Sequence, residues 1–153
     1  WPAIARDAGI SFSPRQVNEL IEQDVLLWAT VDPVMMEWAR RVQASGMKTA
    51  ILSNMGEDLL AYMKENFRWL DDFHHLTWSC ELNIVKPMAE IYNHTLRELD
   101  VRPEEALFID DRLENVEGAR ALGLHALLFH DAHTLEADLR KDKALADLPP
   151  VIR

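Results

Sequence analysis

Hydrophobic positions recur at helical spacing in the first third of the chain. Residues 13–28 begin with Ser13 as an N-cap and Gln16 as the other half of a capping box, and apolar side chains then line one face. A second helix is expected to begin at Asp32 and to end near Gly46, because glycine suits the left-handed position after a helix. Both segments are therefore predicted to be amphipathic helices.

Short, mostly apolar runs alternate with helical segments after this point. Such runs are typical of strands that are buried on both faces of a parallel sheet. The predicted strands are residues 47–52, 76–79, 106–109 and 125–129. The alternation predicts an α/β domain with a doubly wound parallel sheet, covered by helices on both faces. Residues 1–31 are purely helical and lie outside this pattern.

Composition and charge narrow the class of protein. The chain has 153 residues, 48% of them hydrophobic and 27% charged, which suits one compact domain with a substantial core. Its net charge of −10 disfavours binding to nucleic acid or to an anionic membrane, so a small ligand or a protein partner is expected. The longest apolar stretch, residues 124–129, is too short for a membrane helix. The single cysteine excludes an internal disulfide and favours the cytoplasm.

Polar residues follow the predicted strands at the ends where ligands bind in open parallel sheets. Ser53 and Asn54 follow the first strand, Lys86 comes after the second, and Asp110 and Asp111 follow the third. A hydroxyl and an amide can donate to phosphate oxygens, and an ammonium can offset charge that develops on them. Adjacent carboxylates are ligands that Mg²⁺ prefers. Only as a set do these residues indicate a phosphate and metal site.

Each of these residues also has a purely structural interpretation. Ser53 could cap the helix that begins near Glu57, and Asp110 and Asp111 could form the N-cap and solvated turn before the next helix. Lys86 alone would be read as a surface lysine. The sequence leaves these alternatives open.

Two further groups are assigned no chemistry. His74 and His75 have no partner at metal-ligand spacing, so a solvated loop pair is expected. Cys80 has no histidine at a recognisable catalytic spacing and is expected to pack as a small apolar residue.

Three motifs in order resemble one known superfamily. They are the segment from Thr49 to Asn54, the dipeptide Lys86-Pro87, and the segment from Leu107 to Asp111, which Asn115 follows. Together they resemble the haloacid dehalogenase-like hydrolases, and within them the phosphatases with a helical cap, similar to the N-terminal phosphatase domain of epoxide hydrolases. The resemblance implies a Rossmann-like core over residues 32–153 and a remnant of the helical cap over residues 1–31. It also implies that Asn115 orders the loop.

The resemblance assigns a role to each candidate residue. Ser53 would be the phosphate-binding hydroxyl with Asn54 beside it, and Lys86 would neutralise the nucleophile and the transferring phosphoryl group. Asp111 would bind Mg²⁺ directly, and Asp110 would support the metal through water or hydrogen bonds. The implied catalytic residues are thus Lys86, Ser53 and Asp110, the substrate-binding residues Ser53, Asn54 and Lys86, and the metal ligands Asp111 and Asp110.

One motif of the family has no match in the chain. A DxDx(T/V) segment ends the family's first strand and supplies the nucleophilic aspartate, whereas here Asp7 follows no strand and Asp24 lies in the middle of a helix. That first strand is central in the family's sheet, between the strands that end here at Ser53 and Asp110. We therefore expect an α/β core without its N-terminal central strand, and a chain that begins at Trp1 as a cut or degenerate form.

The expected function follows from the resemblance. A complete relative would be a Mg²⁺-dependent phosphatase that acts on small phosphomonoesters through an aspartyl-phosphate, and the 153-residue chain alone is predicted to be inactive and poorly stable. The alternatives are a catalytically inactive binding module of the same fold and a metal-independent 2-haloacid dehalogenase. A small phosphorylated molecule is the expected partner, with no nucleic acid and no membrane, and a homodimer stays open.

Overall fold

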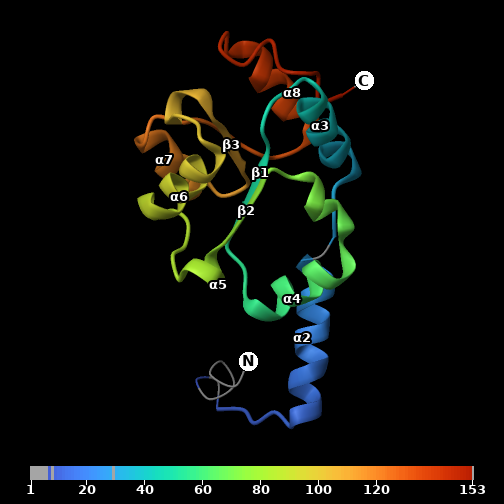
Figure 1. Cartoon of the computed structure of the whole chain (residues 1–153). Coiled ribbons are helices and arrows are strands. Elements are labelled where there is room, and N and C mark those ends of the chain that lie inside the picture. Colours follow the sequence, from blue (N-terminus) through green and yellow to red (C-terminus); the bar gives the residue numbers. More distant parts are fainter. Residues whose placement is uncertain (1–6, 8, 29, 153) are drawn as a thin grey trace.

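The computed structural model describes residues 7, 9–28 and 30–152, and its strands form two parallel pairs (Figure 1). β1 (Ala50–Ser53) pairs with β2 (His75–Trp78), and β3 (Leu107–Asp110) pairs with β4 (His125–Leu128). The predicted α/β class with parallel strands is thus confirmed.

The helices of the described residues alternate with these strands. The α-helices are α2 (Pro14–Trp28), α3 (Pro33–Ala44), α4 (Glu57–Asn66), α5 (Ser79–Leu82), α6 (Ala89–Leu99), α7 (Leu113–Ala121) and α8 (Ala132–Lys141), and the 3₁₀ helices are η1 (Arg68–Asp72) and η2 (Pro103–Glu105). No helix in the described part of the chain is long and apolar enough to span a membrane. Figure 1 shows α2 reaching away from the strands, with α6 and α7 on one side of β3 and α3 and α8 on the other.

Alternating side chains of β3 and β4 pack into two separate hydrophobic cores. Phe108 and Ala126 pack with the apolar faces of α6 and α7. Ile109 and Leu127, one residue further along each strand, pack with α3, α8 and the C-terminal segment. Because successive side chains point to opposite faces of a strand, this pair is covered by helices on both faces, as expected for a doubly wound sheet.

The two strand pairs do not join into one sheet within the described residues. β1 is paired with β2 alone, and β3 with β4 alone, so each of β1 and β3 has a strand partner on only one edge. Within the described residues, the predicted parallel sheet is thus present as two separate strand pairs. A third core lies beside the first pair, where Leu60, Met63, Leu70 and Trp78 pack from α4, η1 and β2.

Local interactions set where α2 and β1 begin. In the capping box of α2, the Ser13 N–H donates to Gln16 Oε1 at 2.9 Å and the Gln16 N–H donates to Ser13 Oγ at 3.3 Å. The strand predicted over 47–52 begins only at Ala50, because the N–H of Thr49 donates to the Nδ1 of His74 instead of to a strand.

The expectation of a solvated loop for His75 is wrong. This residue is the first of β2 and is half-buried, and its Nε2 is buried without a hydrogen-bond partner in the described part of the chain. Its imidazole lies against that of His94 on α6, with the ring centroids 5.7 Å apart. Residues 1–6, 8 and 29, which belong to the predicted cap remnant, lie outside the described residues.

Candidate active site

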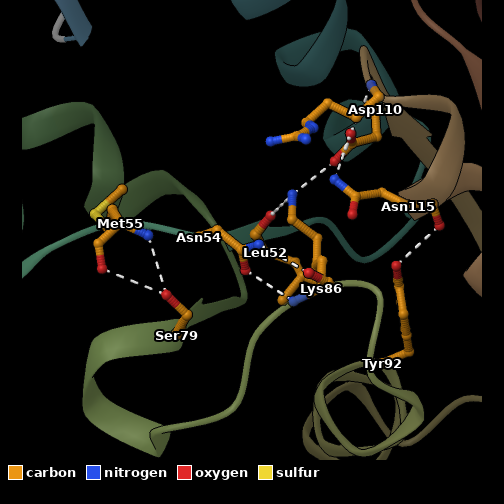
Figure 2. A network of polar contacts seen from close by, with 9 residues as sticks. Leu52, Asn54, Met55, Ser79, Lys86, Tyr92, Asp110 and Asn115 are labelled. Carbon is orange, nitrogen blue, oxygen red and sulfur yellow. Dashed lines mark hydrogen bonds and ion pairs between the residues drawn. The ribbon is translucent and has the colours of Figure 1, made fainter.

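The side chain of Lys86 connects the ends of the two strand pairs. Its Nζ donates to the backbone oxygen of Leu52 in β1 at 2.9 Å and lies 2.6 Å from Oδ2 of Asp110, the last residue of β3 (Figure 2). The Lys86 side chain is 9% exposed and that of Asp110 is 6% exposed. Nζ also lies over the ring of Phe108, 5.5 Å from its centroid. Lys86 is therefore a buried, paired ammonium and not a surface lysine.

Asp110 is held as a carboxylate by donors on both of its oxygens. Oδ2 accepts from Lys86, and Oδ1 accepts from Nδ2 of Asn115 at 2.8 Å and from the N–H of Arg112 at 2.9 Å. Burial alone would raise the pKa of Asp110, but these hydrogen bonds and the charge of Lys86 outweigh it, so the pKa lies below its usual value. Asp110 thus stays charged in the folded protein at neutral pH.

Helix α7 is tied to α6 behind this carboxylate. The hydroxyl of Tyr92 donates to the backbone oxygen of Asn115 at 2.8 Å (Figure 2). Burial first, and the negative charge of Asp110 second, raise the pKa of Tyr92 to about 12. The Tyr92 hydroxyl therefore remains a donor, and it fixes the turn of α7 that holds Asp110.

Asn54 contacts the main chain of Lys86 at two points. Its Oδ1 accepts from the Lys86 N–H at 2.8 Å, and its Nδ2 donates to the Lys86 backbone oxygen at 3.0 Å. The next residue, Met55, is held in turn by Ser79, whose Oγ accepts from the Met55 N–H at 3.0 Å. The structure thus brings Asn54, Lys86 and Asp110 together, as the sequence predicted.

Ser53 and Asp111 lie next to these residues in the chain without bonding to them. Ser53 ends β1 and is half-buried, and within the described residues its hydroxyl has no hydrogen-bond partner. It does not cap α4, whose N-cap is Gly56 without a side-chain hydrogen bond. Asp111 is exposed directly after β3. The hydroxyl of Ser53 and the carboxylate of Asp111 are therefore both free to meet a ligand.

The fit of a metal ion can be judged from the donor set. No cluster of three or more His, Cys, Asp or Glu side chains in the described residues could hold a metal. Magnesium, however, is commonly bound by one or two carboxylates together with phosphate oxygens and several waters. The exposed Asp111 beside Asp110 fits that open mode of binding and does not form a closed cage.

Several contributors to the site were not predicted as such. Tyr92 was not among the predicted site residues, and its role depends on the burial of its hydroxyl, which needs a hydrogen-bond partner. The backbone oxygen of Leu52 and the ring of Phe108 carried no sequence signal, since any apolar residue could occupy those positions.

The polar residues lie at the carboxyl ends of parallel strands in an α/β fold. Comparison with known proteins identifies the family of the chain. The model of the haloacid dehalogenase-like hydrolase family matches residues 6–123. The chain therefore belongs to this family, as its motifs indicated.

Known relatives share part of their length with this chain. The bifunctional epoxide hydrolase 2 of Mus musculus is 30% identical over 118 residues, which are 73% of this chain and 21% of that protein. The sesquiterpene phosphatase of Aspergillus oryzae is 29% identical over 111 residues, which are 72% of this chain and 56% of that protein. The chain thus spans less than two thirds of the length of these curated relatives.

A solved structure supports the same fold. The chain matches a haloacid dehalogenase-family enzyme of Bacteroides thetaiotaomicron, solved as an aspartate-to-alanine variant in complex with magnesium and inorganic phosphate, with a TM-score of 0.61 and 23% identity. The match covers 88% of this chain and 74% of that chain. At this level of identity, the likeness shows the fold.

Proposed function

We propose that this chain carries the phosphate-binding half of a Mg²⁺-dependent phosphatase that acts on small phosphomonoesters. The observation that supports it most is the buried ammonium of Lys86, held between Leu52 and Asp110 at the strand ends. Relatives that are phosphatases and the family membership of the chain support the same reaction class.

Lys86 and Ser53 would act on the phosphoryl group. A preorganised ammonium in a partly water-excluded site offsets the negative charge that develops on phosphoryl oxygens during transfer. The hydroxyl of Ser53, at the end of β1, would donate to one of those oxygens. By the family resemblance, Asn54 belongs to the same substrate-binding set.

Asp111 would be the direct ligand of Mg²⁺, with Asp110 in support. The exposed carboxylate of Asp111 fits this ion, and a solved neighbour in complex with magnesium and phosphate supports the choice of metal. When bound, the ion would supply positive charge beside the phosphate. Asp110 supports this arrangement by holding the ammonium of Lys86 in place, 2.6 Å from its Oδ2.

The nucleophile of the proposed reaction has no counterpart in the described residues. Asp110, which faces Lys86, has both oxygens taken up by donors and a lowered pKa, which makes it a poor nucleophile. The aspartyl-phosphate route of the family would need an aspartate from a strand beside β1 and β3. We propose that the 153-residue chain alone does not turn over phosphomonoesters.

A second candidate is a catalytically inactive module that binds a phosphorylated ligand. The engaged state of Asp110 favours it, because Ser53 and Lys86 could hold a phosphate without any covalent step. The third reading, a metal-independent 2-haloacid dehalogenase, is disfavoured by the adjacent carboxylates of Asp110 and Asp111. We further propose a small-molecule partner and a cytoplasmic setting, and leave a homodimer as an alternative.

Turnover of a generic phosphomonoester separates the first two candidates. Release of p-nitrophenol from p-nitrophenyl phosphate is measured with and without Mg²⁺ for two forms: the chain itself, and the chain joined at its N-terminus to a DxDx(T/V) strand segment from a family phosphatase. We expect Mg²⁺-dependent turnover from the joined form only. Equal Mg²⁺-dependent turnover by both forms would refute the proposal, and no turnover by either would favour the binding module.

A further inference from the structure

Lys86 lies in a turn over residues 85–88, which is held by one internal hydrogen bond and by the side chain of Asn54. Within it, the Met88 N–H donates to the Val85 backbone oxygen at 2.9 Å, which closes the turn on itself. The N–H and backbone oxygen of Lys86 point the other way, and both bond to the side chain of Asn54. Asn54 therefore supplies both hydrogen bonds of the Lys86 main chain in the described part of the protein.

The amide of Asn54 can make this contact in only one orientation. The Lys86 N–H needs an acceptor and its carbonyl needs a donor, so Oδ1 and Nδ2 cannot exchange places without losing both hydrogen bonds. The two bonds, at 2.8 and 3.0 Å, imitate the contact between neighbouring strands. They attach the Lys86 turn to the residue that follows β1.

Packing holds the same turn from the opposite side. Pro87 lies so close to α7 that a Cβ at Gly118 would be 2.8 Å from Pro87 Cβ and 3.1 Å from Pro87 O. This contact sets the separation of the turn from α7, whereas Asn54 sets its separation from β1. Lys86 Nζ must reach Leu52 O on β1 and Asp110 on β3 together, so it depends on both separations.

We propose that Asn54 is a positioning residue for Lys86, holding its main chain by two hydrogen bonds so that the ammonium stays between Leu52 and Asp110. Its consequence for catalysis rests on the proposed phosphatase function. The position of the Lys86 ammonium itself does not depend on that function.

The ring of Phe108 provides a probe of that position in the chain as it exists. Lys86 Nζ lies over this ring at 5.5 Å, so its ε-CH₂ and ammonium signals in NMR should be shifted by the ring current, and Phe108→Leu identifies the shift. Asn54→Ala removes both bonds to Lys86. Asn54→Asp keeps an acceptor for the Lys86 N–H but has no donor for its carbonyl. The control is Asn66→Ala, which removes one hydrogen bond from an asparagine amide to the Tyr62 backbone oxygen on α4.

We expect Asn54→Ala to lose at least half of the ring-current shift of Lys86, Asn54→Asp to lose less, and Asn66→Ala to leave it unchanged. In a catalytically active form, Asn54→Ala is expected to lower kcat about 10-fold, since small misplacements of a catalytic group are costly. A Lys86 signal that is unmoved in a folded Asn54→Ala or Asn54→Asp protein overturns the inference, as does an equal change in Asn66→Ala. Absence of turnover in the form joined to the DxDx(T/V) strand segment would count against the proposed function and leave the NMR result intact.

Discussion

Removal of the Lys86 ammonium is the perturbation whose effect the structure defines best. Lys86→Met keeps most of the length and apolar volume of the side chain but leaves no charge and no donor. The side chain of Asp110 is only 6% exposed, and its Oδ2 would lose the donor Lys86 Nζ, which lies 2.6 Å away. Leu52 O would lose its side-chain donor in the same step.

The expected cost follows from the burial of the pair. Breaking a buried ion pair by removing one partner costs about 3–5 kcal/mol, because the other charge is left uncompensated. Asp110 would keep its hydrogen bonds from Asn115 and Arg112, so we expect the lower end, about 3 kcal/mol. The pKa of Asp110 should also rise, since the hydrogen bond and the charge of Lys86 both hold it down.

The assay is a double-mutant cycle in urea unfolding, with Lys86→Met, Asp110→Asn and the double variant. Removing both partners should cost less than the sum of the single changes, with a coupling energy of about 2 kcal/mol. Titration of the Asp110 carboxyl carbon by NMR checks the pKa in parallel. A Lys86→Met cost below about 0.5 kcal/mol, with an unchanged Asp110 pKa, would refute the reasoning, because surface pairs behave in that way.

Two further predictions concern packing and pH. Gly118→Ala should destabilise the protein by about 1–3 kcal/mol, because the added Cβ meets Pro87 at 2.8 Å. Gly56→Ala adds a Cβ in open space, so it should cost only the preference of the α4 N-cap for glycine over alanine, about 1 kcal/mol or less. A urea midpoint of Gly118→Ala equal to that of the unchanged protein would contradict this. The pKa of His75 is lowered, mainly by burial and also by the neighbouring His94, although the charge of Glu98 acts to raise it. Its partner on β1 is Ala50, which does not titrate. A lowered pKa means that the folded state favours the neutral ring of His75. The contribution of this ring to the free energy of unfolding is therefore present above about pH 6.5 and is lost as the pH falls below that value. His75→Gln should flatten the pH dependence of the melting temperature in that range, and an unchanged slope would speak against the assignment.

The strand ends could be predicted from the sequence because their signals are local. Apolar runs that close on Ser53 and Asp110 fix both the strand and the edge at which its last residue lies. The capping box at Ser13 and the N-cap at Asp32 likewise depend on residues a few positions apart. These features needed no knowledge of the tertiary structure.

The remaining features depend on contacts between distant segments. The bonds from Asn54 to Lys86 join residues 32 positions apart, and the contact of Pro87 with Gly118 depends on how α7 packs. The placement of His75 in β2 was missed because two adjacent histidines look polar, whereas the strand buries one edge of the ring against α6. Such tertiary contacts override local preference.

Binding of inorganic phosphate to the chain tests the central claim most directly, because it requires the strand-end site but no nucleophile. Phosphate is titrated into the protein with and without Mg²⁺ by isothermal calorimetry, and compared with Lys86→Gln and with Lys143→Gln, an exposed lysine remote in sequence from the strand ends. The account predicts saturable binding that Mg²⁺ strengthens, an affinity loss of at least about 10-fold in Lys86→Gln, and none in Lys143→Gln. Equal affinity in both variants, or no binding by the parent chain, would contradict it.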